Sequence, residues 1–212
     1  MTKMILFDLD GTLTDSGEGI INCAWHALKA FNIPLPDKET MRVFVGPPLH
    51  DTFVRFGVPK DRADEAVAIY RSRYIPIGKF ENTPYPGVKE LLERLVEEGH
   101  KLYVATSKPE ALSVEILEHF DLAKYFTLIC GASTDRSRST KEAVIAYLLE
   151  QAGAQENILM VGDTAFDVIG AKQHGIPTIG VSWGYGEVSD MMEAGAAGIA
   201  DTMDELYALL CQ

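Results

Sequence analysis

Short runs of consecutive apolar residues alternate with amphipathic stretches along most of the chain. Five runs predict buried strands: MILFDLD (4–10), KLYVATS (101–107), FTLICGA (126–132), NILMVGD (157–163) and PTIGVSW (177–183). Continuous apolar runs, rather than strict alternation, are typical of parallel strands that are covered on both faces. Between them, the segments 109–120, 140–152 and 164–174 show helical spacing. This βαβ repetition predicts an α/β fold with a doubly wound parallel sheet.

A stretch of about 70 residues that follows the first predicted strand does not continue this alternation of strands and helices. They contain no convincing strand, and three helical patterns instead, at GIINCAWHALKAFNI, 37–56 and 60–78. A connection of this length is not structureless inside a compact domain. We therefore expect a helical subdomain inserted after the first predicted strand.

Charge and cysteine usage narrow the classes of partner. The 212 residues carry a net charge of −12, whereas nucleic acids require clustered Lys and Arg, so we expect no nucleic acid partner. No signal peptide and no membrane-length apolar run is recognisable, which predicts a cytoplasmic protein without a membrane partner. Cys23, Cys130 and Cys211 show no paired or zinc-binding spacing and are expected to be reduced and mostly buried.

Polar residues gather where the predicted strands end. Ligands of an open parallel sheet bind beyond the carboxyl ends of its strands, so these positions are the candidate site. The residues are Asp8 and Asp10 after the first strand, Thr106, Ser107 and Lys108 after the second, Asp163 and Asp167 after the fourth, and Lys141 at the start of the preceding helix. Taken singly, Asp163 and Thr164 could cap the helix that follows, and Lys141 could be a solvated helix residue. Independent helix caps give no reason for acidic residues from distant strands to meet at one edge of the sheet. Their predicted meeting at that edge therefore favours a functional site.

Several carboxylates at one edge repel one another, and a divalent cation removes that repulsion. Oxygen ligands without His or Cys favour Mg²⁺ over zinc. Mg²⁺ with open positions implies a phosphate ligand, which a hydroxyl and a lysine can hold. A carboxylate can attack the phosphorus atom and form an aspartyl-phosphate, while a second acid transfers the proton. Asp8 and Asp10, two positions apart, suit this division of work if both lie on one strand face.

The segments DLDGTLTDS (8–16), ATSK (105–108) and GDTAFDV (162–168), together with Lys141, resemble the four motifs of the haloacid dehalogenase-like hydrolase superfamily. The resemblance spans the chain and points to the phosphatase branch, with a helical cap after the first strand. It implies a Rossmann-like core sheet with the first strand at its centre. It also implies that residues of about 16–83 form an all-helical cap, inserted into a core domain of residues 1–15 and 84–212.

The resemblance assigns roles to these residues. It implies that Asp8 is the nucleophile and Asp10 the general acid and base, and that Lys141 offsets the charge of Asp8. The phosphoryl group would be bound by Ser107 and Lys141, with Thr106 and Lys108 beside them. Magnesium would be held by Asp8, the carbonyl of Asp10 and Asp163, with Asp167 in or just behind the ligand shell.

The presence of Asp10 favours a phosphatase, since dehalogenase members lack an acid there. The chain resembles both phosphoglycolate phosphatases and 5′-nucleotidase-like members. Lys141 lacks the common KPxP continuation, and together with FVGPPL (44–49) and ENTPYPGV (81–88) this favours the nucleotidase-like group. A phosphomutase resembling β-phosphoglucomutase, and a non-catalytic phosphate-binding module, remain as alternatives. A small phosphate ester is the expected partner, and the chain is expected to be a monomer or homodimer.

The expected cap should select the leaving group. Its best candidates are Gly46, Pro47 and Pro48 in a stiff turn, and Arg55 as a cation for a substrate anion. An ordinary interhelical loop and a solvated arginine are the alternatives. After the last predicted strand, Trp183 and Tyr185 either flank the rim of the pocket or pack in the core.

Overall fold

The structure, a computed structural model, describes residues 2–135, 137–153 and 156–212, which form two compact units. One unit contains the residues up to Thr14 together with Pro84–Gln212, and the other is Asp15–Thr83. The chain passes between the units at two short strands that pair with each other, β2 (Thr14–Asp15) and β3 (Thr83–Pro84). The sequence analysis did not predict these strands, because two residues are too few for a periodic pattern.

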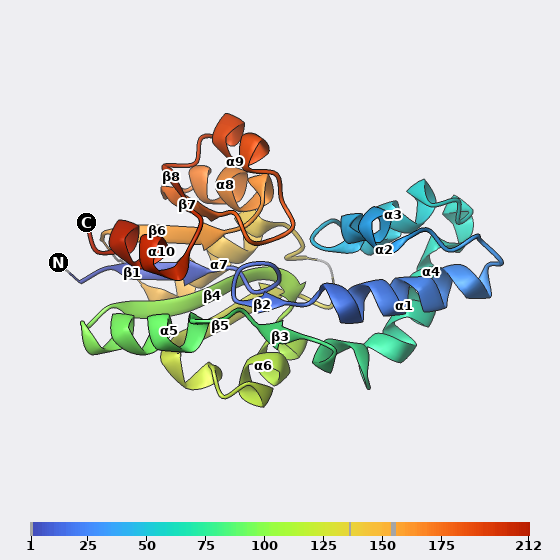
Figure 1. Cartoon of the computed structure of the whole chain (residues 1–212), viewed down its shortest axis with the longest axis horizontal. Coiled ribbons are helices and arrows are strands. Elements are labelled where there is room, and N and C mark those ends of the chain that lie inside the picture. The colour runs from blue at the N-terminus through green and yellow to red at the C-terminus, as the bar shows by residue number, and fades with distance from the viewer. Residues whose placement is uncertain (1, 136, 154–155) are drawn as a thin grey trace. The chain divides into compact units, whose positions relative to one another are not determined.

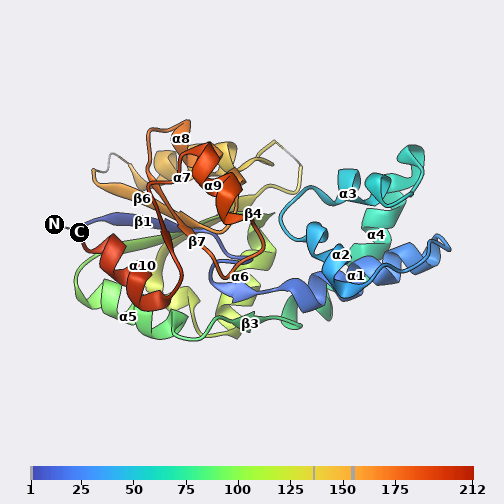
Figure 2. The ribbon, with the colours of Figure 1, turned by 45° about the horizontal axis from the view of Figure 1, so that its top comes forward.

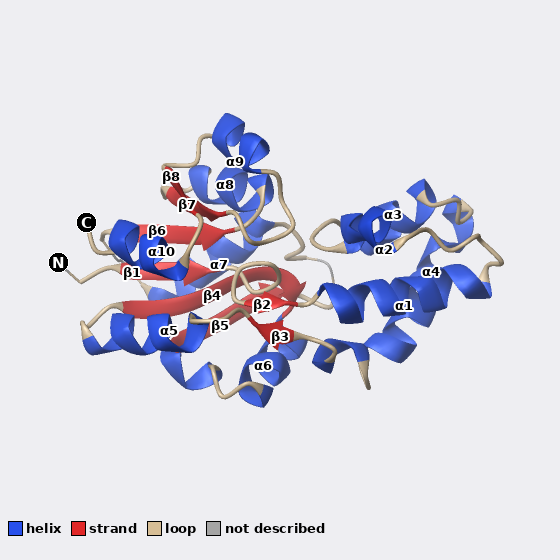
Figure 3. Ribbon diagram, in the orientation of Figure 1, coloured by secondary structure: helices blue, strands red, loops and turns tan. Residues whose placement is uncertain are grey.

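The first unit is built on a six-stranded sheet in the order β5-β4-β1-β6-β7-β8, with every neighbouring pair parallel (Figures 1 and 3). The strands are β1 (Met4–Phe7), β4 (Lys101–Pro109), β5 (Phe126–Ala132), β6 (Ile158–Gly162), β7 (Thr178–Val181) and β8 (Gly198–Ala200). The predicted α/β fold with a parallel sheet is therefore confirmed. The first strand lies at the centre of the sheet, between β4 and β6, as the resemblance implies.

Helices cover both faces of this sheet. They are α5 (Val88–Glu97), α6 (Glu110–His119), α7 (Lys141–Ala152), α8 (Ala165–Lys172), α9 (Val188–Ala194) and α10 (Met203–Leu210). Ile5 and Phe7 pack with residues of α5, α6 and α10, whereas Met4 and Leu6 pack with residues of α7 and α8. Figure 2 shows α5 and α10 on one side of the strands and α7 and α8 on the other. Strands buried on both sides explain why β1 is apolar at every position.

The second unit is helical. Its helices are α1 (Gly17–Ala30), α2 (Lys38–Met41), α3 (Leu49–Arg55) and α4 (Ala63–Tyr74), with 3₁₀ turns at Arg42–Phe44, Lys60–Arg62 and Gly78–Phe80. The expected helix over 37–56 is wrong as one element, because a turn separates α2 from α3. In that turn Gly46 adopts a φ of 99°, and Pro47 and Pro48 lack the N–H group that a continuing helix needs.

Aromatic rings form the centre of the second unit. The Phe44 and Phe53 ring centroids are 5.0 Å apart, and Phe53 lies 6.3 Å from Tyr70 of α4. The edge-on arrangement of both pairs is one that aromatic side chains favour. The turn before α3 is therefore attached to α4 through a packed core.

Two further observations bear on the expectations from composition. Cys23, Cys130 and Cys211 are all free thiols, the first two buried and the third exposed. None of the helices in the described part of the chain has the length and apolar character that a membrane crossing requires.

Candidate active site

The candidate residues meet at the carboxyl ends of β4, β1 and β6, the three neighbouring strands in the middle of the sheet. β1 ends at Phe7, three residues earlier than predicted. The Leu9 carbonyl accepts the N–H groups of Thr12, Leu13 and Thr14, so the backbone turns there instead of continuing as a strand. Leu9 is fully buried in the core. Asp8 and Asp10 thus lie in a tight turn rather than along a strand.

Asp8 is held by backbone, hydroxyl and ammonium groups. Its N–H donates to the Val161 carbonyl at 2.9 Å, and its Oδ1 accepts the Leu9 N–H at 2.8 Å. Thr106 hydrogen-bonds to its carboxylate, and the Lys141 Nζ lies 2.8 Å from Oδ1. Burial raises the pKa of Asp8 to about 6, against the opposing effect of Lys141 and with a further increase from Asp167.

Lys141 is the first residue of α7 and lies buried between two acids. Its Nζ is 2.8 Å from Asp8 Oδ1 and 2.8 Å from Asp167 Oδ1, and it donates to the Ala105 carbonyl at 2.9 Å. Burial lowers the pKa of Lys141, but the charges of Asp167 and Asp8 outweigh it and raise the pKa above its usual value. The ammonium group is therefore charged and links the end of β1 to α8.

Asp167 also has a structural role. Its Oδ2 accepts the Thr164 N–H at 3.0 Å and the Thr164 hydroxyl at 2.9 Å, which closes the first turn of α8. Thr164, and not Asp163, is the N-cap residue of that helix. The carboxylate of Asp163 is consequently available for another purpose.

Asp163 follows β6 and is almost fully buried. Its Oδ2 accepts the N–H of Tyr185 at 2.8 Å, and its Oδ1 accepts the hydroxyl of Thr12 at 3.3 Å. Burial raises the pKa of Asp163 well above its usual range, and the neighbouring Asp167 and Asp8 raise it further. A buried carboxylate among others is costly unless a cation accompanies it.

Asp10 pairs with the second lysine of the site. The Lys108 Nζ lies 2.8 Å from Oδ1 and 2.7 Å from Oδ2 of Asp10. In the structure the ammonium group of Lys108 thus contacts this acid, and its role toward a phosphate stays a prediction. Ser107 is exposed, while Thr106 is buried and bonded to Asp8. Of the two neighbouring hydroxyls, Thr106 is therefore the one that contacts the other site residues.

The donor set fits a divalent cation. Ligand oxygens of Asp8, Asp163 and Asp167 lie within 4.8 Å of one another, and all three residues are buried. If all four acids of the site are ionised, the ammonium groups of Lys108 and Lys141 leave two negative charges within this set. One Mg²⁺ would neutralise them, and carboxylate oxygens are its preferred protein ligands.

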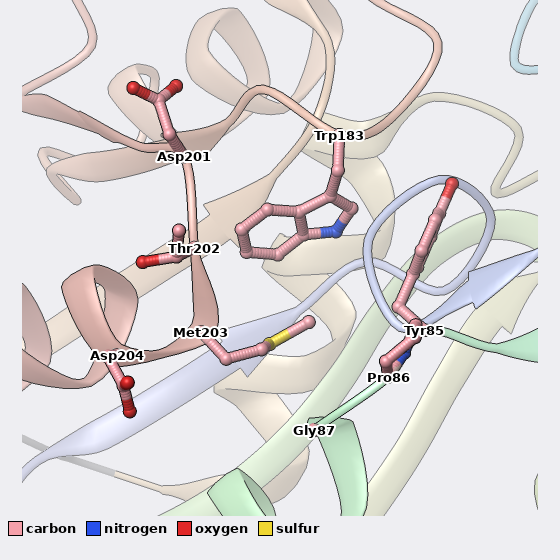
Figure 4. Close-up of a pocket in the computed structure, with 8 residues that line it drawn as sticks. All are labelled: Tyr85, Pro86, Gly87, Trp183, Asp201, Thr202, Met203 and Asp204. Carbon is pink, nitrogen blue, oxygen red and sulfur yellow. The ribbon is translucent and has the colours of Figure 1, made fainter.

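Trp183 and Tyr185 take two different positions. Trp183 lines an open pocket whose other walls are Tyr85, Pro86, Gly87, Asp201, Thr202, Met203 and Asp204, with the Trp183 ring opposite the end of the Met203 side chain (Figure 4). Its indole Nε1 donates to the Thr12 carbonyl at 3.2 Å. Tyr185 instead contributes its backbone N–H to Asp163. Trp183 also packs against the hydrophobic core, which is one of the two expected alternatives. In addition, both residues contact the site through polar groups.

The four expected cap residues all lie in the second unit. Gly46, Pro47 and Pro48 form the turn before α3, and Arg55 is the last residue of that helix. Their role toward a substrate stays a prediction.

Thr12 and Gly184 are site residues that the sequence analysis did not single out. Thr12 lies within the quoted motif DLDGTLTDS, so its position was a usable signal. Gly184 leaves no room for a side chain beside Asp163, because a Cβ there would lie 2.3 Å from Oδ2, and no side-chain pattern reveals such a close approach.

Comparison with known proteins agrees with this geometry. Residues 5–181 match the family model described as haloacid dehalogenase-like hydrolase. A 5′-nucleotidase of Pseudomonas aeruginosa is 44% identical over 189 residues, which cover 88% of this chain and 86% of that protein. The tyrosine-protein kinase PtkA of Mycobacterium tuberculosis is 42% identical over 211 residues, which cover 98% of this chain and 72% of that protein.

A solved structure is similar throughout. The crystal structure of a predicted phosphatase from Clostridium acetobutylicum superimposes with a TM-score of 0.94 at 42% identity. The match covers 100% of this chain and 99% of that chain.

Proposed function

The chain belongs to the haloacid dehalogenase-like hydrolase family and is a phosphatase, and we propose that it hydrolyses small phosphomonoesters with Mg²⁺ through an aspartyl-phosphate on Asp8. The observation that carries this proposal is the buried Asp8 at the end of the central strand, with Lys141 at 2.8 Å and two further acids beside it. Binding alone would not require a buried carboxylate with an adjacent second acid.

In the first step, a carboxylate oxygen of Asp8 attacks the phosphorus atom and the ester P–O bond breaks. Asp10 donates a proton to the leaving oxygen, so that an alcohol departs. In the second step, a water molecule attacks the phosphorus atom and gives its proton to Asp10. The bond between Asp8 and phosphorus breaks, inorganic phosphate leaves, and both acids return to their starting state.

Two lysines and a hydroxyl position the two acids and the phosphoryl group for these steps. Lys141 holds Asp8 in place and keeps positive charge beside the phosphoryl group. Thr106 hydrogen-bonds to Asp8, and we assign it with Lys141 to the phosphoryl oxygens. Lys108 holds Asp10 through both carboxylate oxygens, which orients this acid before substrate binds.

Asp8, Asp163 and the backbone carbonyl of Asp10 would hold Mg²⁺, with Asp167 beside them. When bound, the ion offsets the negative charge that develops on the phosphoryl oxygens. A phosphate ester and four carboxylates would otherwise repel each other at this site.

A 5′-nucleotide is the substrate that we favour. The relative at 44% identity is named 5′-nucleotidase, and the sequence around Lys141 and the segment FVGPPL point the same way. We propose that the second unit acts as a cap that chooses the leaving group, with Gly46, Pro47, Pro48 and Arg55 as its contact residues. Phosphoglycolate is the second substrate to compare.

The experiment is a comparison of kcat/KM over purified phosphomonoesters, including nucleoside monophosphates, phosphoglycolate and hexose phosphates. We expect Mg²⁺-dependent phosphate release that EDTA abolishes. Asp8→Asn should lower kcat by at least about 10⁴-fold, because the substituted amide is not a nucleophile. Full activity of Asp8→Asn would refute the proposal, and an isomerised hexose phosphate would support a phosphomutase instead.

A second candidate function comes from the relative named tyrosine-protein kinase, at 42% identity. In that case the phosphoryl group of Asp8 would pass to a tyrosine hydroxyl rather than to water. Incubation with a ³²P-labelled phosphate donor separates the two, since label on tyrosine supports transfer and label in free phosphate supports hydrolysis.

A further inference from the structure

Asp163 is confined by backbone on several sides. Both of its carboxylate oxygens accept a hydrogen bond, Oδ2 from the Tyr185 N–H at 2.8 Å and Oδ1 from the Thr12 hydroxyl at 3.3 Å. Its exposed fraction is 1%. A carboxylate oxygen has two lone-pair sites, so each oxygen keeps one for a further ligand.

Two glycines enclose the same carboxylate. A methyl group on Gly11 would lie 2.0 Å from Asp163 Oδ2, and one on Gly184 would lie 2.3 Å from the same oxygen. Such distances are far below van der Waals contact, so a side chain at either position requires Asp163 to move. The Asp163 carboxylate therefore has little freedom to turn.

The loop after β7 connects these contacts. Trp183 donates its indole N–H to the Thr12 carbonyl at 3.2 Å, and Thr12 donates its hydroxyl to Asp163. Tyr185, two residues beyond Trp183, donates its N–H to the other oxygen of Asp163. These hydrogen bonds, together with the backbone of residues 183–185, form a closed ring that includes the Asp163 carboxylate.

We propose that Thr12, Trp183, Gly184 and Tyr185, here called the Asp163 clasp, are positioning residues that set the affinity and selectivity of the site for Mg²⁺. This inference rests on the proposed function, in which Asp163 is a metal ligand. Groups that orient a metal ligand typically contribute 10- to 100-fold to metal affinity. Mg²⁺ demands near-octahedral geometry, whereas Ca²⁺ tolerates irregular ligands. A rigid Asp163 therefore favours the smaller ion.

The test is isothermal titration of the purified protein with Mg²⁺ alone and with Ca²⁺ alone. Thr12→Val removes the hydroxyl donor, and Trp183→Phe removes the indole N–H donor while an aromatic ring remains. We expect each variant to raise the Kd for Mg²⁺ about 10-fold. The Kd for Ca²⁺ should rise less, so that the preference for Mg²⁺ declines. Gly184→Ala disturbs Asp163 more strongly, because it adds a methyl group against the carboxylate, and it should raise the Kd for Mg²⁺ further.

The chain offers matched controls. Trp25 in the second unit also donates its indole N–H to a carbonyl, that of Pro36 at 2.9 Å, so Trp25→Phe loses the same kind of bond elsewhere. Gly198→Ala adds a methyl group whose nearest neighbour is 3.7 Å away, an ordinary contact. Both controls should bind Mg²⁺ as the wild type does.

Unchanged Mg²⁺ affinity in both Thr12→Val and Trp183→Phe would overturn the clasp and leave the proposed phosphatase intact. The same holds if these variants lower only the unfolding midpoint, since that marks a purely structural role. A wild-type protein that binds no Mg²⁺ would overturn the metal assignment and the clasp together. If Gly184→Ala fails to fold, the two milder variants still decide the question.

Discussion

At the scale of single residues, Asp8 shows how opposing effects combine in the site. The ammonium group of Lys141 lies within hydrogen-bond distance and favours the ionised carboxylate. Burial and the nearby Asp167 act in the opposite direction and prevail, so the pKa of Asp8 rises to about 6. The positive charge of Lys141 thus does not fully offset burial and the repulsion between the acids around it. Without a metal ion, the ionised acids should destabilise the folded protein at neutral pH.

This destabilisation predicts how stability depends on pH. An acid whose pKa rises on folding binds its proton more tightly in the folded state, so stability falls as pH rises between the two pKa values. For Asp8 the window runs from its ordinary pKa of 3.8 to about 6. In EDTA, the free energy of unfolding should decline over this window by about 3 kcal/mol on account of Asp8. Asp163, with its raised pKa, acts in the same direction.

Urea unfolding at a series of pH values in EDTA measures the effect. Asp8→Asn is the control, because it removes the titrating group and should flatten the decline. Mg²⁺ at pH 7 should restore stability in proportion to its binding. A wild-type protein and an Asp8→Asn variant with the same pH dependence would contradict the prediction.

The site residues differ in how visible they are in the sequence. Asp8, Asp163 and Lys141 could be predicted, since their side chains carry the chemistry and strand order brings them together. The pairing of Lys108 with Asp10 could not, because residues 98 positions apart meet only through the paired β1 and β4. The Tyr185 contribution is a backbone N–H, which every residue except proline possesses.

At the scale of elements, the start of α7 matters because Lys141 is its first residue. Thr140 is the N-cap, and its hydroxyl accepts the Ala143 N–H at 3.2 Å. This bond satisfies one of the free N–H groups of the first turn and fixes where the helix begins.

We predict that Thr140→Ala lowers the free energy of unfolding by about 1 kcal/mol, because the cap bond is lost. Thr140→Ser keeps a hydroxyl and should retain most of the stability. Urea unfolding of both variants in EDTA measures the difference. Equal stability of the Ala and Ser variants would show that the cap contributes nothing.

Elements were predictable where their pattern was long and regular. The apolar runs that correspond to β4, β5 and β6 lie within a few residues of the observed strands. The three-residue β8 was missed because it is too short to show a pattern. α5 was also missed, although its amphipathic sequence VKELLERLVE was a usable signal. In the second unit, Gly46, Pro47 and Pro48 separate α2 from α3. These residues interrupt a pattern that is otherwise helical over 37–56.

At the scale of the whole molecule, the candidate metal ligands all belong to one of the two units. Asp8, Asp163 and Asp167 lie in the unit that contains the sheet, and the unit of Asp15–Thr83 contributes none of these three. A ligand that binds one folded unit stabilises that unit by its binding free energy.

Hydrogen exchange read by mass spectrometry can therefore assign the effect of the ion to a unit. Mg²⁺ should slow exchange in peptides from β1, β6 and α8, because opening of these elements releases the ion. Peptides from α1, α3 and α4 should exchange at nearly the same rate with and without Mg²⁺. Equal protection of both units would contradict this prediction and show that they open together.

The central position of β1 also has a consequence during synthesis. Met4 of β1 pairs with Lys101 of β4 and with Ile158 of β6, so one of its partners follows 154 positions later. At typical translation speeds of 5 to 20 residues per second, that partner emerges about 8 to 30 s after β1. During this interval the four apolar residues of β1 lack the neighbour that completes their sheet. The nascent chain should therefore be a candidate for chaperones that bind short hydrophobic segments, until β6 leaves the ribosome and closes the middle of the sheet.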